Sequence, residues 1–161
     1  MKCLVWREQI EGIINGDFKA PVIAEIDCTN VCNHRCTYCI NVNYRKKNLK
    51  TLEPAVLLEL INILYYWGVK AVVFIGGGEP LMNKGTLDAI EMAHDLGLPT
   101  ALVSNGGMLD ERAIEVVNRC CEWAGFSLDA ATNETHKALH NPKGGKDFDG
   151  IIEMIRQLNE M

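Results

Sequence analysis

The sequence lacks long apolar runs and lacks an excess of positive charge. Its longest apolar stretches, 71–75 and the interrupted run 57–68, fall short of the roughly 18 residues that span a bilayer. Lys and Arg number 16 against 21 Asp and Glu, which gives a formal net charge of −5. Nucleic-acid-binding proteins usually carry an overall basic footprint. We therefore expect neither a membrane partner nor a nucleic-acid partner.

The N-terminal residues have no apolar core of the secretory type, because charged residues appear already at Lys2, Arg7 and Glu8. We therefore expect a cytoplasmic protein. The apolar fraction of 48% and the charged fraction of 23% are typical of a folded globular chain. A length of 161 residues favours one domain. We divide it into an N-terminal lead-in at 1–20 and a core at 21–161.

Cysteine is the unusual component of this composition. The seven cysteines are an odd number, so they cannot form a closed set of disulfides. In a reducing compartment, grouped cysteines more often bind metal or take part in catalysis. We interpret Cys3, Cys120 and Cys121, which stand outside the group, as small packing residues.

Strand-like and helix-like segments alternate along residues 21–161. The apolar runs predict strands at 22–27, 71–75, 99–103 and 123–128. Between and after them, helical spacing and capping residues predict helices starting near Thr51, at Thr86, after Asp110 and at Asp147 or Asp149. Such alternation predicts the α/β class with a parallel sheet of about four βα units.

Each predicted strand is followed by a polar or glycine-rich turn. Parallel α/β folds bind their ligands at the carboxyl ends of the strands, so we expect one site at this rim. The turns comprise Asp27 and Cys28, Gly76 to Glu79, Ser104 and Asn105, and Ser127 and Asp129.

The loop after the first strand holds Cys32, Cys36 and Cys39 in the spacing C-x3-C-x2-C. Thiolates this close must surround one centre. Structural zinc usually takes four protein ligands, whereas three thiolates on a four-iron cluster leave one iron open for another ligand. Cys28 extends the series, so a four-cysteine zinc site or a closed iron–sulfur site stays an alternative.

With these motifs the sequence resembles the radical S-adenosylmethionine (radical SAM) enzymes, whose signature is C-x3-C-x-aromatic-C after the first barrel strand. The resemblance extends from residue 22 to about residue 158. The matching motifs are Cys32, Cys36, Tyr38 and Cys39, then Gly77-Gly78-Glu79-Pro80, Ser104-Asn105-Gly106, and Ser127-Leu128-Asp129 followed by His136.

The resemblance implies a [4Fe–4S] cluster held by Cys32, Cys36 and Cys39, with S-adenosylmethionine (SAM) on its fourth iron. It also implies reductive cleavage of SAM to a 5′-deoxyadenosyl radical that abstracts hydrogen from a small-molecule or peptide substrate, with a flavodoxin- or ferredoxin-like electron donor. The implied SAM contacts are Gly77, Gly78 and Glu79 to the amino group, Ser104, Asn105, Ser127 and Asp129 to ribose or carboxylate, and Tyr38 near adenine.

The family barrel usually has six βα units, and this chain supplies about four. Open edge strands tend to pair with another chain. The chain is a fragment of a longer enzyme, a minimal member, or a subunit that completes its sheet by oligomerising. We expect an open partial barrel, with a homo-oligomer as a hypothesis.

Two other functions stay open: a non-catalytic metal-binding module that holds zinc, and a SAM binder without turnover. We interpret His34 as a solvated loop residue. His136 and His140 are interpreted as polar rim residues, with a substrate role as the alternative. The basic group between Arg45 and Lys50 is interpreted as a solvated face, or as an attractor of an anionic substrate.

Overall fold

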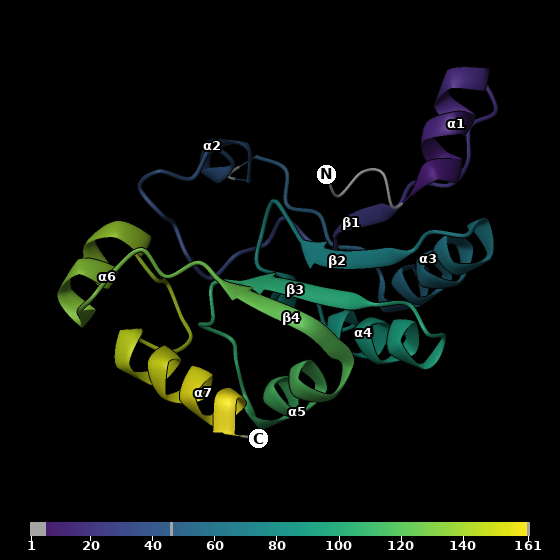
Figure 1. Cartoon of the computed structure of the whole chain (residues 1–161). Helices are drawn as coiled ribbons and strands as arrows, with labels where there is room; N and C mark the ends of the chain where they lie inside the picture. The colour runs from purple at the N-terminus through teal and green to yellow at the C-terminus, as the bar shows by residue number, and fades with distance from the viewer. Residues whose placement is uncertain (1–5, 46, 161) are drawn as a thin grey trace.

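The computed structural model describes residues 6–45 and 47–160, and its strands form one parallel sheet in the order β1-β2-β3-β4. Figure 1 shows β1 and β4 at opposite edges of a sheet that does not close. The predicted α/β class and open partial barrel are therefore confirmed. The strands are β1 (Ile23–Asp27), β2 (Ala71–Ile75), β3 (Thr100–Ser104) and β4 (Cys121–Phe126).

Helices α3, α4 and α5 lie along one face of the sheet (Figure 1). No helix within the described residues is long and apolar enough to cross a membrane. The helices are α1 (Arg7–Asn15), α2 (Val42–Arg45), α3 (Pro54–Trp67), the 3₁₀ turn η2 (Pro80–Met82), α4 (Thr86–Asp95), α5 (Glu111–Cys120), α6 (Asn133–His140) and α7 (Phe148–Glu160).

The core lies between the sheet and these helices. Val72 and Phe74 of β2 are fully buried, and they belong to one apolar cluster with Leu57 and Ile61 of α3 and Ile90 of α4. Side chains alternate between the two faces of a strand. The residues of β2 that flank Val72 and Phe74 are accordingly only half-buried. The sheet thus has one face covered by helices and a second face that is more accessible.

The start of α3 differs from the prediction. The helix begins at Pro54, with Glu53 as its N-cap, rather than near Thr51. Thr51 instead forms an isolated antiparallel bridge with Thr29. This bridge joins the two ends of the cysteine loop, so Thr51 is used to close that loop. The helix ends at Gly68, where φ is 96°, a left-handed conformation that glycine adopts at little cost.

The predicted N-cap is wrong for helix α4 and correct for helix α5. Gly85, not Thr86, is the N-cap of α4. The Thr86 hydroxyl is turned away and donates to the Pro80 carbonyl oxygen at 2.7 Å. Asp110 caps α5 as predicted, because its carboxylate accepts the Ala113 N–H at 2.8 Å.

The region after β3 departs further from the sequence pattern. Strand β4 begins at Cys121, directly after α5, and pairs there with Thr100, so the predicted range 123–128 is two residues late. Helix α6 was not predicted at all. It is opened by a capping box between Thr132 and Thr135. Helix α7 follows the predicted Asp147, whose carboxylate accepts the Gly150 N–H at 3.0 Å.

Candidate active site

A pocket of about 360 Å³ opens where the strands end, between the cysteine loop and the turns after β2 and β3. Of the predicted site residues, the structure brings ten to this pocket. Asp129 is not among the lining residues but accepts a hydrogen bond from the Tyr38 hydroxyl at 2.7 Å. The ten are Cys32, Cys36, Tyr38, Cys39, Gly77, Gly78, Glu79, Ser104, Asn105 and Ser127.

The turn from Gly76 to Glu79 packs its main chain directly against the main chain of the cysteine loop. The Glu79 N–H donates to the Val31 carbonyl oxygen at 2.8 Å. A methyl group on Gly78 would lie 2.6 Å from the Thr29 carbonyl oxygen and closer still to that of Val31. Only glycine permits this approach. The Gly-Gly sequence therefore fixes the position of the loop that carries the three cysteines.

The Glu79 side chain is directed into the protein and is 1% exposed. Its carboxylate accepts from the Ser104 hydroxyl at 2.7 Å, the Asn105 N–H at 2.7 Å and the Leu81 N–H at 3.1 Å. Burial raises the pKa of the carboxyl, and these three donors oppose that rise. Glu79 thus ties the end of β2 to the end of β3. Its contact to the SAM amino group stays a prediction.

The side chain of Asn105 is also engaged within the chain. Its Nδ2 donates to Asn33 Oδ1 at 2.8 Å and lies 3.7 Å from Cys32 Sγ, while its Oδ1 accepts the Gly107 N–H at 2.8 Å. The Ser104 hydroxyl, besides donating to Glu79, accepts the Gly106 N–H at 3.0 Å. The predicted SAM contacts of both residues therefore remain predictions.

Asn33, which directly follows Cys32 in the sequence, holds the site together. It is 7% exposed and connects three segments that are distant in the sequence. Its Nδ2 donates to the Gly144 carbonyl oxygen at 3.0 Å, and its own carbonyl oxygen accepts the Lys143 N–H at 2.7 Å. With the bond to Asn105, these contacts hold the cysteine loop between β3 and the segment before α7.

The three predicted cluster ligands are half-buried at the pocket wall. The His34 N–H donates to Cys32 Sγ at 3.4 Å, and His140 Nδ1 lies 3.4 Å from Cys36 Sγ. Burial raises the pKa of the Cys36 thiol, so metal binding must displace a proton there.

In the part of the chain that the structure describes, the sulfurs of Cys32, Cys36 and Cys39 do not form a compact site for a single ion. Zn–S bonds of about 2.3 Å place the sulfurs of a tetrahedral site about 3.8 Å apart. Among the described residues, the group whose three ligand atoms lie within 4.8 Å of one another consists of histidines, and the cysteine sulfurs form no such group. Cys32, Cys36 and Cys39 line one pocket, and three thiolates are the ligand set for a four-iron cluster with one open iron.

Cys28 does not join the other three cysteines. It is fully buried, belongs to the apolar core, and its Sγ lies 3.9 Å from the Ile26 carbonyl oxygen. Burial raises the pKa of its thiol to about 11, which disfavours the thiolate that a metal needs. The geometry therefore supports a three-cysteine rather than a four-cysteine site. Cys120 is likewise buried in the core, whereas Cys3 lies outside the described residues.

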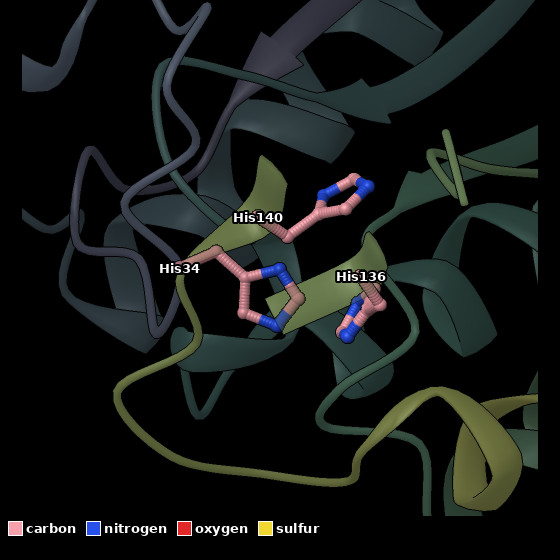
Figure 2. Close-up of side chains that lie close together, drawn as sticks. All are labelled: His34, His136 and His140. Carbon is pink, nitrogen blue, oxygen red and sulfur yellow. The ribbon is translucent and has the colours of Figure 1, made fainter. Parts of the chain in front are cut away.

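Three histidines, His34, His136 and His140, lie side by side next to the cysteine loop (Figure 2). All three are buried, at 1%, 1% and 0% exposure, so the interpretation of His34 as a solvated loop residue is wrong. Burial lowers the pKa of each, that of His34 to about 4. The cysteine loop packs on the end of α6, where the Arg35 N–H donates to the His140 carbonyl oxygen at 3.0 Å. This contact brings the His34 ring against those of His136 and His140.

An open parallel α/β sheet with three closely spaced cysteines after its first strand defines a radical SAM type of core. The family model for the radical SAM superfamily matches residues 26–161, and the chain therefore belongs to the radical SAM superfamily. The cofactors of this superfamily are a [4Fe–4S] cluster and SAM, as the sequence motif predicted.

Several of the curated relatives are enzymes by name. A SAM-dependent nucleotide dehydratase from Lacinutrix mariniflava is 26% identical over 152 residues, which cover 89% of this chain and 32% of that protein. A GTP 3′,8-cyclase from Alkaliphilus oremlandii is 30% identical over 144 residues, covering 81% of this chain and 42% of the cyclase. The chain thus spans about a third of the length of the first curated relatives it matches.

Solved structures agree on the fold. SuiB from Streptococcus suis, in its complex with SAM, superposes with a TM-score of 0.74 at 18% sequence identity, covering 96% of this chain and 35% of SuiB. SuiB has also been solved with its precursor peptide SuiA, and that structure gives a TM-score of 0.75. At this level of identity the likeness shows the partial barrel alone.

Proposed function

We propose that this protein is a radical SAM enzyme in which Cys32, Cys36 and Cys39 hold a [4Fe–4S] cluster. The observation that carries the proposal is the single pocket that these cysteines share with the Gly-Gly-Glu turn and the ends of β3 and β4. When bound, the cluster supplies the electron that cleaves SAM into methionine and a 5′-deoxyadenosyl radical, which abstracts hydrogen from the substrate.

The chain's own residues bind and orient SAM in this proposal. Gly77 and Gly78 allow close approach of the ligand's methionine moiety to the main chain. Glu79 supports that turn and provides the carboxylate predicted to face the SAM amino group. The remaining predicted contacts are Ser104 and Asn105 at the end of β3, Ser127 and Asp129 after β4, and Tyr38 on the cysteine loop.

For the substrate we propose a nucleotide. The names of the relatives, a nucleotide dehydratase and a GTP cyclase, support this class. A second pocket of about 420 Å³, lined in part by Lys50, adjoins the site and shares Asn41 and Gly77 with it. The Lys50 ammonium at this edge suits a phosphate group, which would lie away from the Asp27 carboxylate of the same pocket. SuiB was solved with a precursor peptide, so a peptide is the second candidate.

We further propose a flavodoxin- or ferredoxin-like protein as electron donor and a homo-oligomer as the assembled state. The open edges β1 and β4 favour pairing of sheets. Trp123 on the edge strand β4 is 52% exposed and adds apolar surface to this edge. Light scattering that finds only monomer at high protein concentration would refute the oligomer.

Anaerobic reconstitution with iron and sulfide tests the main proposal. We expect a brown protein that dithionite reduces and that releases 5′-deoxyadenosine from SAM. A colourless protein with one bound zinc would identify a structural metal module instead. A reducible cluster without 5′-deoxyadenosine would identify a SAM binder without turnover. Addition of GTP or of a peptide panel then distinguishes the two substrate classes by stimulated cleavage of SAM.

A matched pair of cysteine variants tests the ligand assignment. Cys36→Ala removes a pocket sulfur and should abolish the cluster. Cys120→Ala removes a sulfur buried in the core, at 3% exposure, and should leave iron content unchanged. Equal iron content in the two variants would contradict the assignment.

A further inference from the structure

The His140 side chain lies at the C-terminal end of α6, fully buried, with both ring nitrogens in contact with other groups. Its Nε2 lies 3.1 Å from the Asp129 main-chain nitrogen. Its Nδ1 lies 3.4 Å from Cys36 Sγ and 3.2 Å from the Tyr38 hydroxyl oxygen. A histidine from the far end of the chain thus touches a predicted cluster ligand.

The contacts of His140 determine where its proton resides. A main-chain N–H only donates, so the Asp129 N–H requires Nε2 to be the acceptor. A ring nitrogen that accepts a hydrogen bond carries no proton, so the imidazole is neutral in this arrangement. A neutral imidazole carries one proton, which is therefore on Nδ1. The nitrogen facing Cys36 is a hydrogen-bond donor.

Two acceptors face this N–H, and Cys36 is the one that carries charge. The Tyr38 hydroxyl proton is already used, because it donates to Asp129 Oδ2 at 2.7 Å. The Tyr38 oxygen is a neutral acceptor, whereas the sulfur of a cysteine that ligates iron is a thiolate. Hydrogen bonds to a charged acceptor are the stronger ones. The Nδ1–H of His140 therefore donates mainly to the Cys36 thiolate rather than to the Tyr38 oxygen.

We propose that His140 is a positioning residue that donates a hydrogen bond from Nδ1 to Cys36 Sγ and thereby raises the reduction potential of the cluster. This inference rests on the proposed function. Reduction adds negative charge to the cluster and its thiolates, and a donor to a ligand sulfur stabilises that charge. Asp129 and Tyr38 complete the arrangement, since they fix the tautomer and the ring orientation of His140.

A three-histidine metal site is the competing interpretation of the same residues. The ligand atoms of His34, His136 and His140 lie within 4.8 Å of one another (Figure 2), and His136 Nε2 is buried without a hydrogen-bond partner. Both nitrogens of His140, however, already have partners. The rings of His136 and His140 stack with an interplanar angle of 28°, an arrangement of packed rings. The contacts favour donation to sulfur.

The test compares reconstituted chains by EPR-monitored redox titration. We expect His140→Phe to keep the cluster and to shift its midpoint potential to a more negative value. His140→Asn retains an N–H near the Nδ1 position and should restore part of the shift. His136→Phe, on the same helix but without contact to Cys36, is the matched control and should leave the potential unchanged.

A second measurement detects the hydrogen bond itself. After exchange into D₂O, the exchangeable-deuteron coupling to the reduced cluster should be equal in the wild type and His136→Phe and weaker in His140→Phe, where the His34 N–H on Cys32 Sγ remains as a donor. Equal potentials and equal couplings in all variants would overturn the inference while leaving the cluster intact. Failure of the wild type to form a cluster would overturn the proposed function. Zinc bound by the wild type and lost from both Phe variants would replace the inference by a metal site.

Discussion

Glu79 Oε1 accepts a hydrogen bond from the Ser104 hydroxyl at 2.7 Å, deep inside the protein. Glu79 follows β2, and Ser104 is the last residue of the adjacent strand β3. Both belong to motifs that the sequence assigned to SAM binding. The bond shows that these motifs also hold each other in place. A change at Glu79 therefore acts on SAM binding and on folding together, and the two effects need separate measurements.

We predict that Glu79→Ala retains iron content, weakens SAM binding and lowers the free energy of unfolding. The substitution leaves the Ser104 hydroxyl and the Asn105 N–H buried without their acceptor, which costs about 1–3 kcal/mol for an unsatisfied group. Equilibrium titration with SAM and chemical denaturation measure the two effects.

Glu59→Ala is the control for Glu79, because Glu59 is exposed on α3 and should change stability by no more than about 0.5 kcal/mol. Unchanged SAM affinity in Glu79→Ala would show that the carboxylate serves the fold only.

Gly78→Ala should displace the cysteine loop. The added methyl would meet the carbonyl oxygens of Thr29 and Val31, which belong to main chain and cannot rotate away. Overpacking of this kind costs about 1–3 kcal/mol. We expect lower stability and lower iron content on reconstitution. Gly144→Ala, where nothing lies within 4 Å of the new atom, should match the wild type in both. Equal behaviour of the two variants would mean that the loop adapts.

Cys28→Ala separates the core cysteine from the cluster ligands. Cys28 is fully buried in the apolar cluster, so loss of its sulfur leaves a small cavity and should cost about 1 kcal/mol, as for one buried methyl group. Iron and sulfide content should equal those of the wild type. If iron analysis after reconstitution shows that this variant has lost the cluster, Cys28 is a ligand and the site has four cysteines.

The strand and helix alternation was predictable because each core element has a clear apolar pattern. Residues 71–75 are continuously apolar and form β2 with the predicted bounds. Helix α6 lacks any such pattern. Its buried side chains are His136 and His140, and its start is specified by the hydroxyls of Thr132 and Thr135. Polar packing of this kind depends on partners supplied by the fold, so periodicity does not reveal it.

The candidate active site also has one part that the sequence predicts and one part that it does not. The spacing of Cys32, Cys36 and Cys39 predicts three ligands in one place, because the loop between them is short. The contact between Cys36 and His140 joins residues 104 positions apart, and no local spacing encodes it. The sequence marked His140 only as a rim residue. The signal available was its place after the fourth strand, whose end lies beside the cysteine loop in a parallel sheet.

The last prediction concerns the stability of the metal-free chain in acid. Burial lowers the pKa of His136 below the value of about 6.5 that it has in the unfolded chain, with nearby Asp147 opposing the effect. Between these two pKa values the unfolded state binds a proton that the folded state does not bind. The free energy of unfolding therefore decreases as the pH falls through this range.

We expect denaturant titrations at pH 7.5 and pH 5.5, about one unit either side of the unfolded pKa, to show lower stability at the acidic pH. His136→Phe removes one contributor, so the difference between the two pH values should shrink. It should not vanish, because burial also lowers the pKa of His34 and His140. His94→Asn, a substitution at an exposed position of α4, should keep the full difference. If His136→Phe and the wild type lose equal stability on acidification, His136 does not contribute to the acid sensitivity of the fold.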